Sequence, residues 1–170
     1  MSKAQRTLRA AGLATGLALA ALLLIAVRVP TSSGALGAGV RLTAVPPGDL
    51  SVPLKPFLVA RNLVSGGRTA RGTLRLENIS SGAVHAQLRL RPEVDLLDRG
   101  LHVQLYAGDR RLAAGPLGRL RGWSRPALVP DAGKVRIRAL AHVPAGAEEY
   151  QGRFVDVPVE IRTRLVEERR

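Results

Sequence analysis

The most constraining feature of this chain is a two-residue alternation of apolar and polar side chains that recurs from Val40 onward. A period of two places alternate side chains on opposite faces of a strand, so each such segment is predicted to be a half-buried β-strand. The pattern is clearest over 74–77, 84–91, 101–106, 135–143 and 155–161, and further strands are expected over 40–45, 54–60 and 110–112.

The segments between these strands are rich in Gly, Pro, Asn and Asp, which favour turns. Ser80-Ser81-Gly82 predicts a hairpin between the strands before and after it, and Gly108-Asp109 predicts a second one. Residues 115–126 are expected to form an irregular crossover with one helical turn. Pro158 lacks an N–H for a central ladder, which predicts an edge strand or an unpaired position there. The expected fold is all-β, an antiparallel β-sandwich of the jelly-roll or immunoglobulin-like kind.

The N-terminus has the pattern of an export or anchor signal. Lys3, Arg6 and Arg9 precede an uncharged run over 10–27, and small residues follow at Ser33-Gly34-Ala35. Positive charge before an apolar run predicts a cytoplasmic N-terminus with the rest of the chain outside. Cleavage after the small residues and retention as an N-terminal membrane anchor both stay open, because Arg28 directly follows the apolar run.

These patterns divide the chain into three parts. Residues 1–35 are assigned to the signal or anchor with its linker, 36–164 to the β-sandwich, and 165–170 to a charged C-terminal tail. Setting the first part aside removes four basic residues and no acid, so the net charge falls from +13 to +9. The remaining protein is still clearly basic. The absence of cysteine excludes a disulfide framework, so the exported domain is expected to depend on its aliphatic core.

The basic residues concentrate on the polar positions of the predicted strands. If these side chains point to solvent, they form either an ordinary solvated face or a surface for an anionic polymer of the cell envelope. Only Tyr106 among the aromatic residues is expected on such a face, so sequence-specific recognition of nucleic acid is not expected. The candidate polyanion-binding residues are Arg75, Arg89, Arg91, Arg136 and Arg138.

No catalytic pattern is present in the sequence. His85, His102 and His142 each fall on the polar side of a separate strand, with no HExxH motif and no close pair within one element. There is no GxSxG nucleophile elbow and no phosphate-binding loop. The sequence therefore predicts no enzyme, no catalytic residues, no metal site and no cofactor.

The order of several short motifs resembles the bacterial camelysin/TasA family of exported β-sandwich proteins, over roughly residues 39–164. The motifs are Gly39-Val40-Arg41-Leu42, Arg61-Asn62-Leu63, the 72–78 strand ending in Asn78, Leu101–Tyr106, Pro116–Leu120 and Tyr150-Gln151-Gly152-Arg153. The chain departs from the family pattern at Gly66-Gly67-Arg68, where a Pro-Gly-Asp or Pro-Gly-Glu turn is expected. The resemblance implies export and a sandwich fold. It also implies fibre formation or surface metalloprotease activity, but no protease motif is present to carry a catalytic role.

Together these observations predict a secreted or cell-surface protein that is not an enzyme, placed outside the cytoplasm or anchored at its N-terminus. Its expected partners are further copies of itself or related matrix proteins, joined through sheet edges. The alternative is an envelope polyanion bound by an arginine-rich sheet face, and camelysin-like proteolysis is the weakest interpretation.

Overall fold

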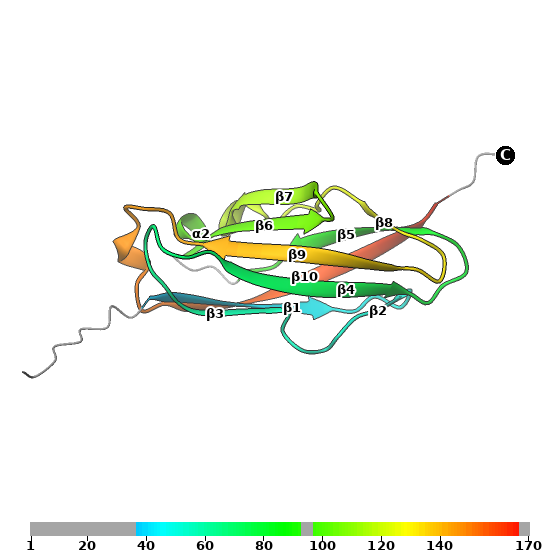
Figure 1. Ribbon diagram of the computed structural model, residues 1–170, viewed down its shortest axis with the longest axis horizontal. Helices are drawn as coiled ribbons and strands as arrows, with labels where there is room; N and C mark the ends of the chain where they lie inside the picture. The colour runs from blue at the N-terminus through cyan, green and yellow to red at the C-terminus, as the bar shows by residue number, and fades with distance from the viewer. Residues whose placement is uncertain (1–36, 93–96, 167–170) are drawn as a thin grey trace, which may run out of the picture. The chain divides into compact units, whose positions relative to one another are not determined.

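The computed structural model describes residues 37–92 and 97–166, which form two five-stranded β-sheets (Figure 1). Sheet A has the strand order β3 (Leu58–Leu63), β1 (Ala38–Val45), β10 (Phe154–Leu165), β5 (Val84–Leu90) and β8 (Ala127–Val129). Sheet B has the order β2 (Leu50–Ser51), β4 (Ala70–Asn78), β9 (Lys134–His142), β6 (His102–Ala107) and β7 (Arg110–Pro116). The prediction of an all-β fold with two sheets is confirmed.

Helical structure in the described residues is limited to three single turns, which are α2 (Leu97–Gly100), η1 (Leu117–Arg119) and η2 (Glu148–Tyr150). The turn η1 is the one predicted within residues 115–126. No helix in the described part of the chain is long and apolar enough to cross a membrane. The predicted signal or anchor over residues 1–35 lies outside the described residues, as does 167–170 of the predicted tail.

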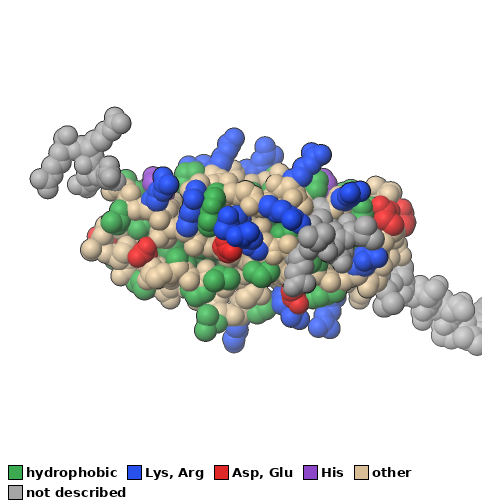
Figure 2. Space-filling model, turned by 180° about the vertical axis from the view of Figure 1, so that it is seen from behind, with side chains coloured by type: hydrophobic (Ala, Val, Ile, Leu, Met, Phe, Trp, Pro, Cys, Tyr) green, Lys and Arg blue, Asp and Glu red, His purple; other side chains and the backbone are tan. Residues whose placement is uncertain are grey.

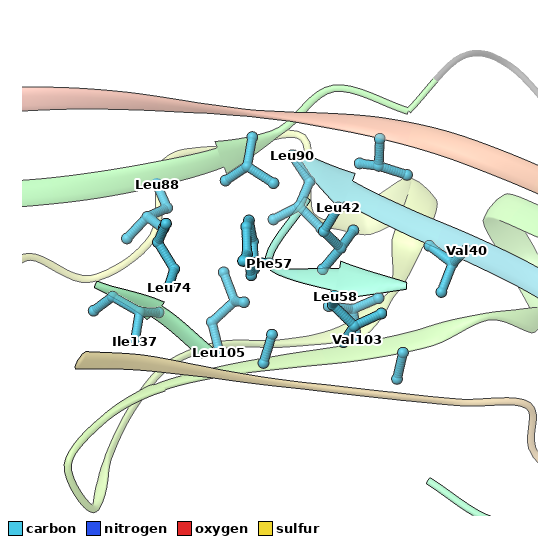
Figure 3. Close-up of a cluster of buried hydrophobic side chains, with 14 of the residues drawn as sticks. Val40, Leu42, Phe57, Leu58, Leu74, Leu88, Leu90, Val103, Leu105 and Ile137 are labelled. Carbon is cyan, nitrogen blue, oxygen red and sulfur yellow. The ribbon is translucent and has the colours of Figure 1, made fainter. Parts of the chain in front are cut away.

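The alternating apolar residues of both sheets meet in one core between them (Figure 3). Strands of sheet A contribute Leu42, Leu58, Leu88 and Leu90, and strands of sheet B contribute Leu74, Leu105 and Ile137, all at most 2% exposed. Phe57 and Tyr150 are the aromatic residues in this core. Aliphatic side chains therefore supply most of the buried surface that stabilises the fold.

The strand that contains Pro158 is central, so the prediction of an edge strand is wrong. β10 lies between β1 and β5, and its pairing with β1 is parallel, in contrast to the predicted antiparallel arrangement. The Pro158 carbonyl accepts a hydrogen bond from the Arg91 N–H at 2.9 Å. The N and O of one strand residue point to the same side, so the missing N–H faces the chain just after the last residue of β5. A proline is tolerated there because few ladder bonds remain to be lost.

The turn at Ser80-Ser81-Gly82 connects the two sheets. The prediction of a hairpin at this turn is therefore wrong. β4 pairs with β2 and β9 in sheet B, whereas β5 pairs with β10 and β8 in sheet A. Asn78 fixes this corner, because its buried amide donates to the carbonyls of Gly82 at 2.8 Å and Pro130 at 3.0 Å. Its Oδ1 also accepts the Ser80 N–H at 3.0 Å. The Asn78 side chain thus takes the place of ladder bonds where the chain changes sheet.

Other strand predictions hold with shifted bounds. The hairpin at Gly108-Asp109 is confirmed as β6–β7, with a register shift between Leu105 and Tyr106. The strand expected over 54–60 begins later, at Leu58. The short strands β2 and β8 were not predicted, because two or three residues are too few to show a period.

Both lateral edges of the two sheets are joined by backbone hydrogen bonds. On one side the Thr73 N–H of β4 donates to the Phe57 carbonyl at 3.2 Å. On the other side the Arg125 N–H donates to the Leu112 carbonyl of β7 at 3.0 Å. Gly72 allows the first contact, because a Cβ at this position would lie 2.1 Å from the Phe57 carbonyl oxygen. These bonds occupy groups that an edge strand otherwise offers to another chain.

Candidate functional site

The structure places the five predicted arginines on two opposite surfaces. Arg75, Arg136 and Arg138 point outward from sheet B, on β4 and β9. Arg89 belongs to β5 of sheet A, and Arg91 directly follows that strand. The predicted residues therefore do not form one surface, and the two groups have different surroundings.

The outward arginines of sheet B form what we call the basic face, which consists of Arg71, Arg75, Arg111, Arg136 and Arg138. All five are exposed, and no ion pair involving any of them occurs within the described residues. Arg75 and Arg136 are direct cross-strand partners in the antiparallel pair β4–β9. Residues in such positions have Cβ atoms about 5 Å apart, and like charges there destabilise the sheet. A bound anion would therefore relieve the repulsion between these two arginines and stabilise the sheet at this position.

A row of side chains continues the basic face across three strands. Arg138 of β9 is in register with Tyr106 of β6, which is in register with Arg111 of β7. The Arg138 guanidinium carbon lies 5.3 Å from the centre of the Tyr106 ring. The Tyr106 hydroxyl donates to Oε1 of Gln104 at 2.8 Å, which fixes the ring on the sheet. The row therefore presents two guanidinium groups on either side of an anchored aromatic ring.

Acidic side chains are scarce on this side of the molecule. Among the outward residues of β4, β9, β6 and β7 the one acid is Glu77, which lies two residues after Arg75 at the end of the β4–β9 ladder and pairs with Lys134 at 3.0 Å. The positive charge of the basic face is thus not neutralised by its own sheet.

Sheet A differs, because acids on β10 pair with three arginines on this side of the molecule, which are Arg41, Arg89 and Arg91. Glu160 accepts hydrogen bonds from Nε and Nη2 of Arg89 at its Oε2 and from Nε of Arg91 at its Oε1, the last at 2.9 Å. Arg41 pairs with Asp156 at 3.3 Å. Figure 2 views the molecule from behind, the side on which β10 lies in Figure 1, and shows basic side chains with acidic ones among them. Arg89 and Arg91 are therefore better explained as structural ion pairs than as anion ligands.

Trp123 packs onto the same side of sheet A. The guanidinium carbons of Arg89 and Arg162 both lie 4.3 Å from the centre of its ring. Arg162 is oriented by Gln87, whose Oε1 accepts its Nε–H at 3.1 Å, and Gln87 in turn donates to the Ser124 carbonyl at 2.7 Å. Each cation–π contact of this kind contributes about 0.5–2 kcal/mol. The arginines here hold the 120–126 crossover against the sheet.

The ion pairs of Glu160 predict acid sensitivity of the fold. Hydrogen bonds from Arg89 are the main cause that holds the pKa of Glu160 below its ordinary value of 4.5, with Arg91 acting in the same direction. A carboxyl with a depressed folded-state pKa binds fewer protons when folded, so its contribution is present above pH 4.5 and is lost as pH falls through the folded-state pKa. We expect the melting temperature of the wild type to fall more than that of E160Q between pH 5 and pH 3, as measured by circular dichroism. An equal fall in both proteins would show that these pairs do not stabilise the fold.

Two of the three predicted outward histidines are brought together. His102 and His142 are cross-strand partners in β6 and β9, with ring centroids 5.4 Å apart and planes tilted by 54°. Burial, and then the nearby His142, lower the pKa of His102. His85 lies on sheet A, where its Nδ1 is buried and has no hydrogen-bond partner among the described residues. Within the described residues no cluster of three or more His, Cys, Asp or Glu side chains could hold a metal ion.

A second basic feature is a cavity of about 480 Å³ lined by Arg99, Pro116, Gly118, Arg119 and Arg121. It was not predicted, because its residues come from α2, the end of β7, the turn η1 and the loop after it, and the folded chain brings α2 together with the others. Arg71 and Arg111 were also missed. Extending the alternation of the 74–77 strand back by three residues would have found Arg71, whereas the register shift in β6–β7 hides Arg111.

Comparison with known proteins does not place the chain in a family. No protein-family model matches the sequence, and no curated protein matches it significantly. The camelysin/TasA resemblance thus rests on the short motifs given above.

Proposed function

We propose that this protein is a non-enzymatic, exported β-sandwich whose basic face binds a phosphate-bearing anionic polymer of the cell envelope. The observation that carries the proposal is the exposed pair Arg75 and Arg136, which oppose each other across β4–β9 with no ion-pair partner among the described residues. Guanidinium groups match the geometry of phosphate oxygens and form charge-assisted hydrogen bonds with them.

The spread of the charge favours an extended ligand. Arg71 and Arg75 lie on β4, Arg136 and Arg138 on β9, and Arg111 on β7, so the basic face crosses strands β4 to β7. Neighbouring strands lie about 4.8 Å apart, and next-but-one residues on a strand lie about 7 Å apart. A polymer with repeated phosphates can contact several such guanidinium groups at once, whereas a single small anion would contact one or two.

If the anionic polymer is a nucleic acid, the chemistry of the basic face favours contacts with its phosphate backbone over recognition of its bases. Tyr106 is the aromatic ring next to the basic face, and its neighbours in register are arginines. One ring offers one stacking platform, which is too little for reading a nucleotide sequence. We therefore propose phosphate recognition without sequence specificity, outside the cytoplasm, with a jelly-roll or immunoglobulin-like arrangement of the strands.

Mapping the bound surface tests this proposal. When inorganic polyphosphate is added to isotope-labelled full-length protein, the largest changes in NMR chemical shift are expected in β4, β9 and β6. Residues of β5 and of β10 around Glu160 should change little, because Glu160 is paired with Arg89 and Arg91. Changes centred on β10 and β5 would contradict the proposal, and so would an absence of binding at low salt.

Self-association through a sheet edge is a second candidate. Its support is β3, a six-residue edge strand of sheet A on which Val59 is 51% exposed. An exposed edge with apolar side chains can pair with another chain. The bond from Thr73 to the Phe57 carbonyl lies beside this edge, which reduces the backbone groups on offer. We therefore place self-assembly second and camelysin-like proteolysis last.

A further inference from the structure

The paired histidines of sheet B are a second chemical feature, distinct from the arginines. His142 is the last residue of β9 and His102 the first of β6, and these strands lie side by side (Figure 1). Both rings are half-buried on the outer side of the sheet. Their centroids are 5.4 Å apart.

The backbone under the two rings is held firmly in place. Leu101 and Val103 flank His102, Ala141 and Val143 flank His142, and all four are at most 2% exposed. Cross-strand partners have Cβ atoms about 5 Å apart, so the two imidazoles share one small region of surface. Ligands held on paired strands lose little freedom when they bind an ion, which favours binding.

We propose that His102 and His142 together bind one late first-row divalent metal ion, such as Zn²⁺, Cu²⁺ or Ni²⁺. Imidazole nitrogens bind Zn²⁺ at about 2.0–2.1 Å, so a tetrahedral angle at the metal requires two nitrogens about 3.3 Å apart. For rings whose centroids lie 5.4 Å apart, this spacing requires the two imidazoles to turn one nitrogen each toward the other by rotation about χ1 and χ2. Two nitrogen ligands and no carboxylate favour these ions over Mg²⁺ and Ca²⁺, which prefer oxygen.

The site leaves coordination positions open. Within the described residues no third His, Cys, Asp or Glu joins the pair, so water or an oxygen of an external ligand would complete the shell. In register beside His102 on β7 is Pro116, which adds no charge. The pair therefore fits a surface site that exchanges its metal, and it departs from the sequence-based expectation of no metal site. The metal proposal does not depend on the anion-binding proposal.

Titration of the purified full-length protein with Zn²⁺ alone tests the inference by isothermal calorimetry. We expect saturable binding of one ion, with at least about tenfold weaker affinity in both H102Q and H142Q. H85Q is the matched control, because it removes a half-buried outward histidine from the other sheet and should leave the affinity unchanged. Mg²⁺ should not compete.

A stability measurement gives a second readout that does not depend on heats of binding. A ligand that binds only the folded state raises the melting temperature, so Zn²⁺ should raise it in the wild type and H85Q but not in H102Q or H142Q. Melting of the metal-free variants reports whether each has folded. The inference is overturned if Zn²⁺ up to about 1 mM does not bind. The inference is also overturned if H102Q and H142Q bind Zn²⁺ with wild-type affinity, or if H85Q no longer binds Zn²⁺.

Discussion

Replacing Arg75 and Arg136 together by glutamine is expected to weaken polyphosphate binding by about 10- to 100-fold at low salt, as measured by calorimetry. The two guanidinium groups oppose each other across β4–β9 without an ion-pair partner in the part of the chain that the structure describes, so each can contribute charge-assisted bonds to the ligand. Their removal also relieves a like-charge contact, so the folded state of R75Q/R136Q should be at least as stable as the wild type.

The matched control removes the same charge from the other sheet. Arg61 of β3 and Arg164 of β10 are exposed outward residues without a described ion pair, and R61Q/R164Q lowers the net charge by the same two units. Its affinity for polyphosphate should stay within about twofold of the wild type. If both double variants lose affinity equally, binding depends on net charge and not on the basic face.

The second large effect is expected from Gly72→Ala, which should destabilise the fold by about 3 kcal/mol. A Cβ at Gly72 would lie 2.1 Å from the Phe57 carbonyl oxygen and 2.6 Å from the Leu58 Cβ. Leu58 is the first residue of β3 in the other sheet and Phe57 directly precedes it, so the two sheets must separate at this edge or lose the Thr73 to Phe57 hydrogen bond. Urea unfolding followed by circular dichroism measures the loss.

Gly48→Ala is the control for this substitution. No atom lies within 4 Å of a Cβ built at Gly48, so alanine fits there without contact. Its stability should equal that of the wild type or exceed it by up to about 1 kcal/mol, because alanine restricts the unfolded chain. If both variants lose a similar free energy of unfolding, the close approach of Gly72 to Phe57 is not the cause of the destabilisation.

Residue alternation predicted most of the strands, because it reports directly which face of a strand is buried. The segments around Leu88, Leu105, Ile137 and Val157 form strands with alternate residues in the core. Alternation does not report which sheet a strand joins. The turn after Asn78 therefore resembled a hairpin, although hydrogen bonds from that buried amide carry the chain from one sheet to the other.

The same limit applies to the candidate site. The sequence correctly placed Arg75, Arg89, Arg91, Arg136 and Arg138 outside the core, but their division between two sheets depends on strand order. Pairing with Glu160 is set by the register of β10 against β5, across about seventy residues of sequence. The fold therefore decides which arginines are free to bind an anion, and the spacing of residues in the sequence does not reveal it.

The salt dependence of polyphosphate binding tests the central claim most directly. Each direct phosphate contact releases counterions, so the slope of log affinity against log salt becomes shallower by roughly 0.7–0.9 for each contact removed. The slope for R75Q/R136Q should therefore be shallower than that of the wild type by about 1.4–1.8, while R61Q/R164Q keeps the wild-type slope. Equal slopes for the wild type and R75Q/R136Q would contradict direct binding of the polymer by the basic face.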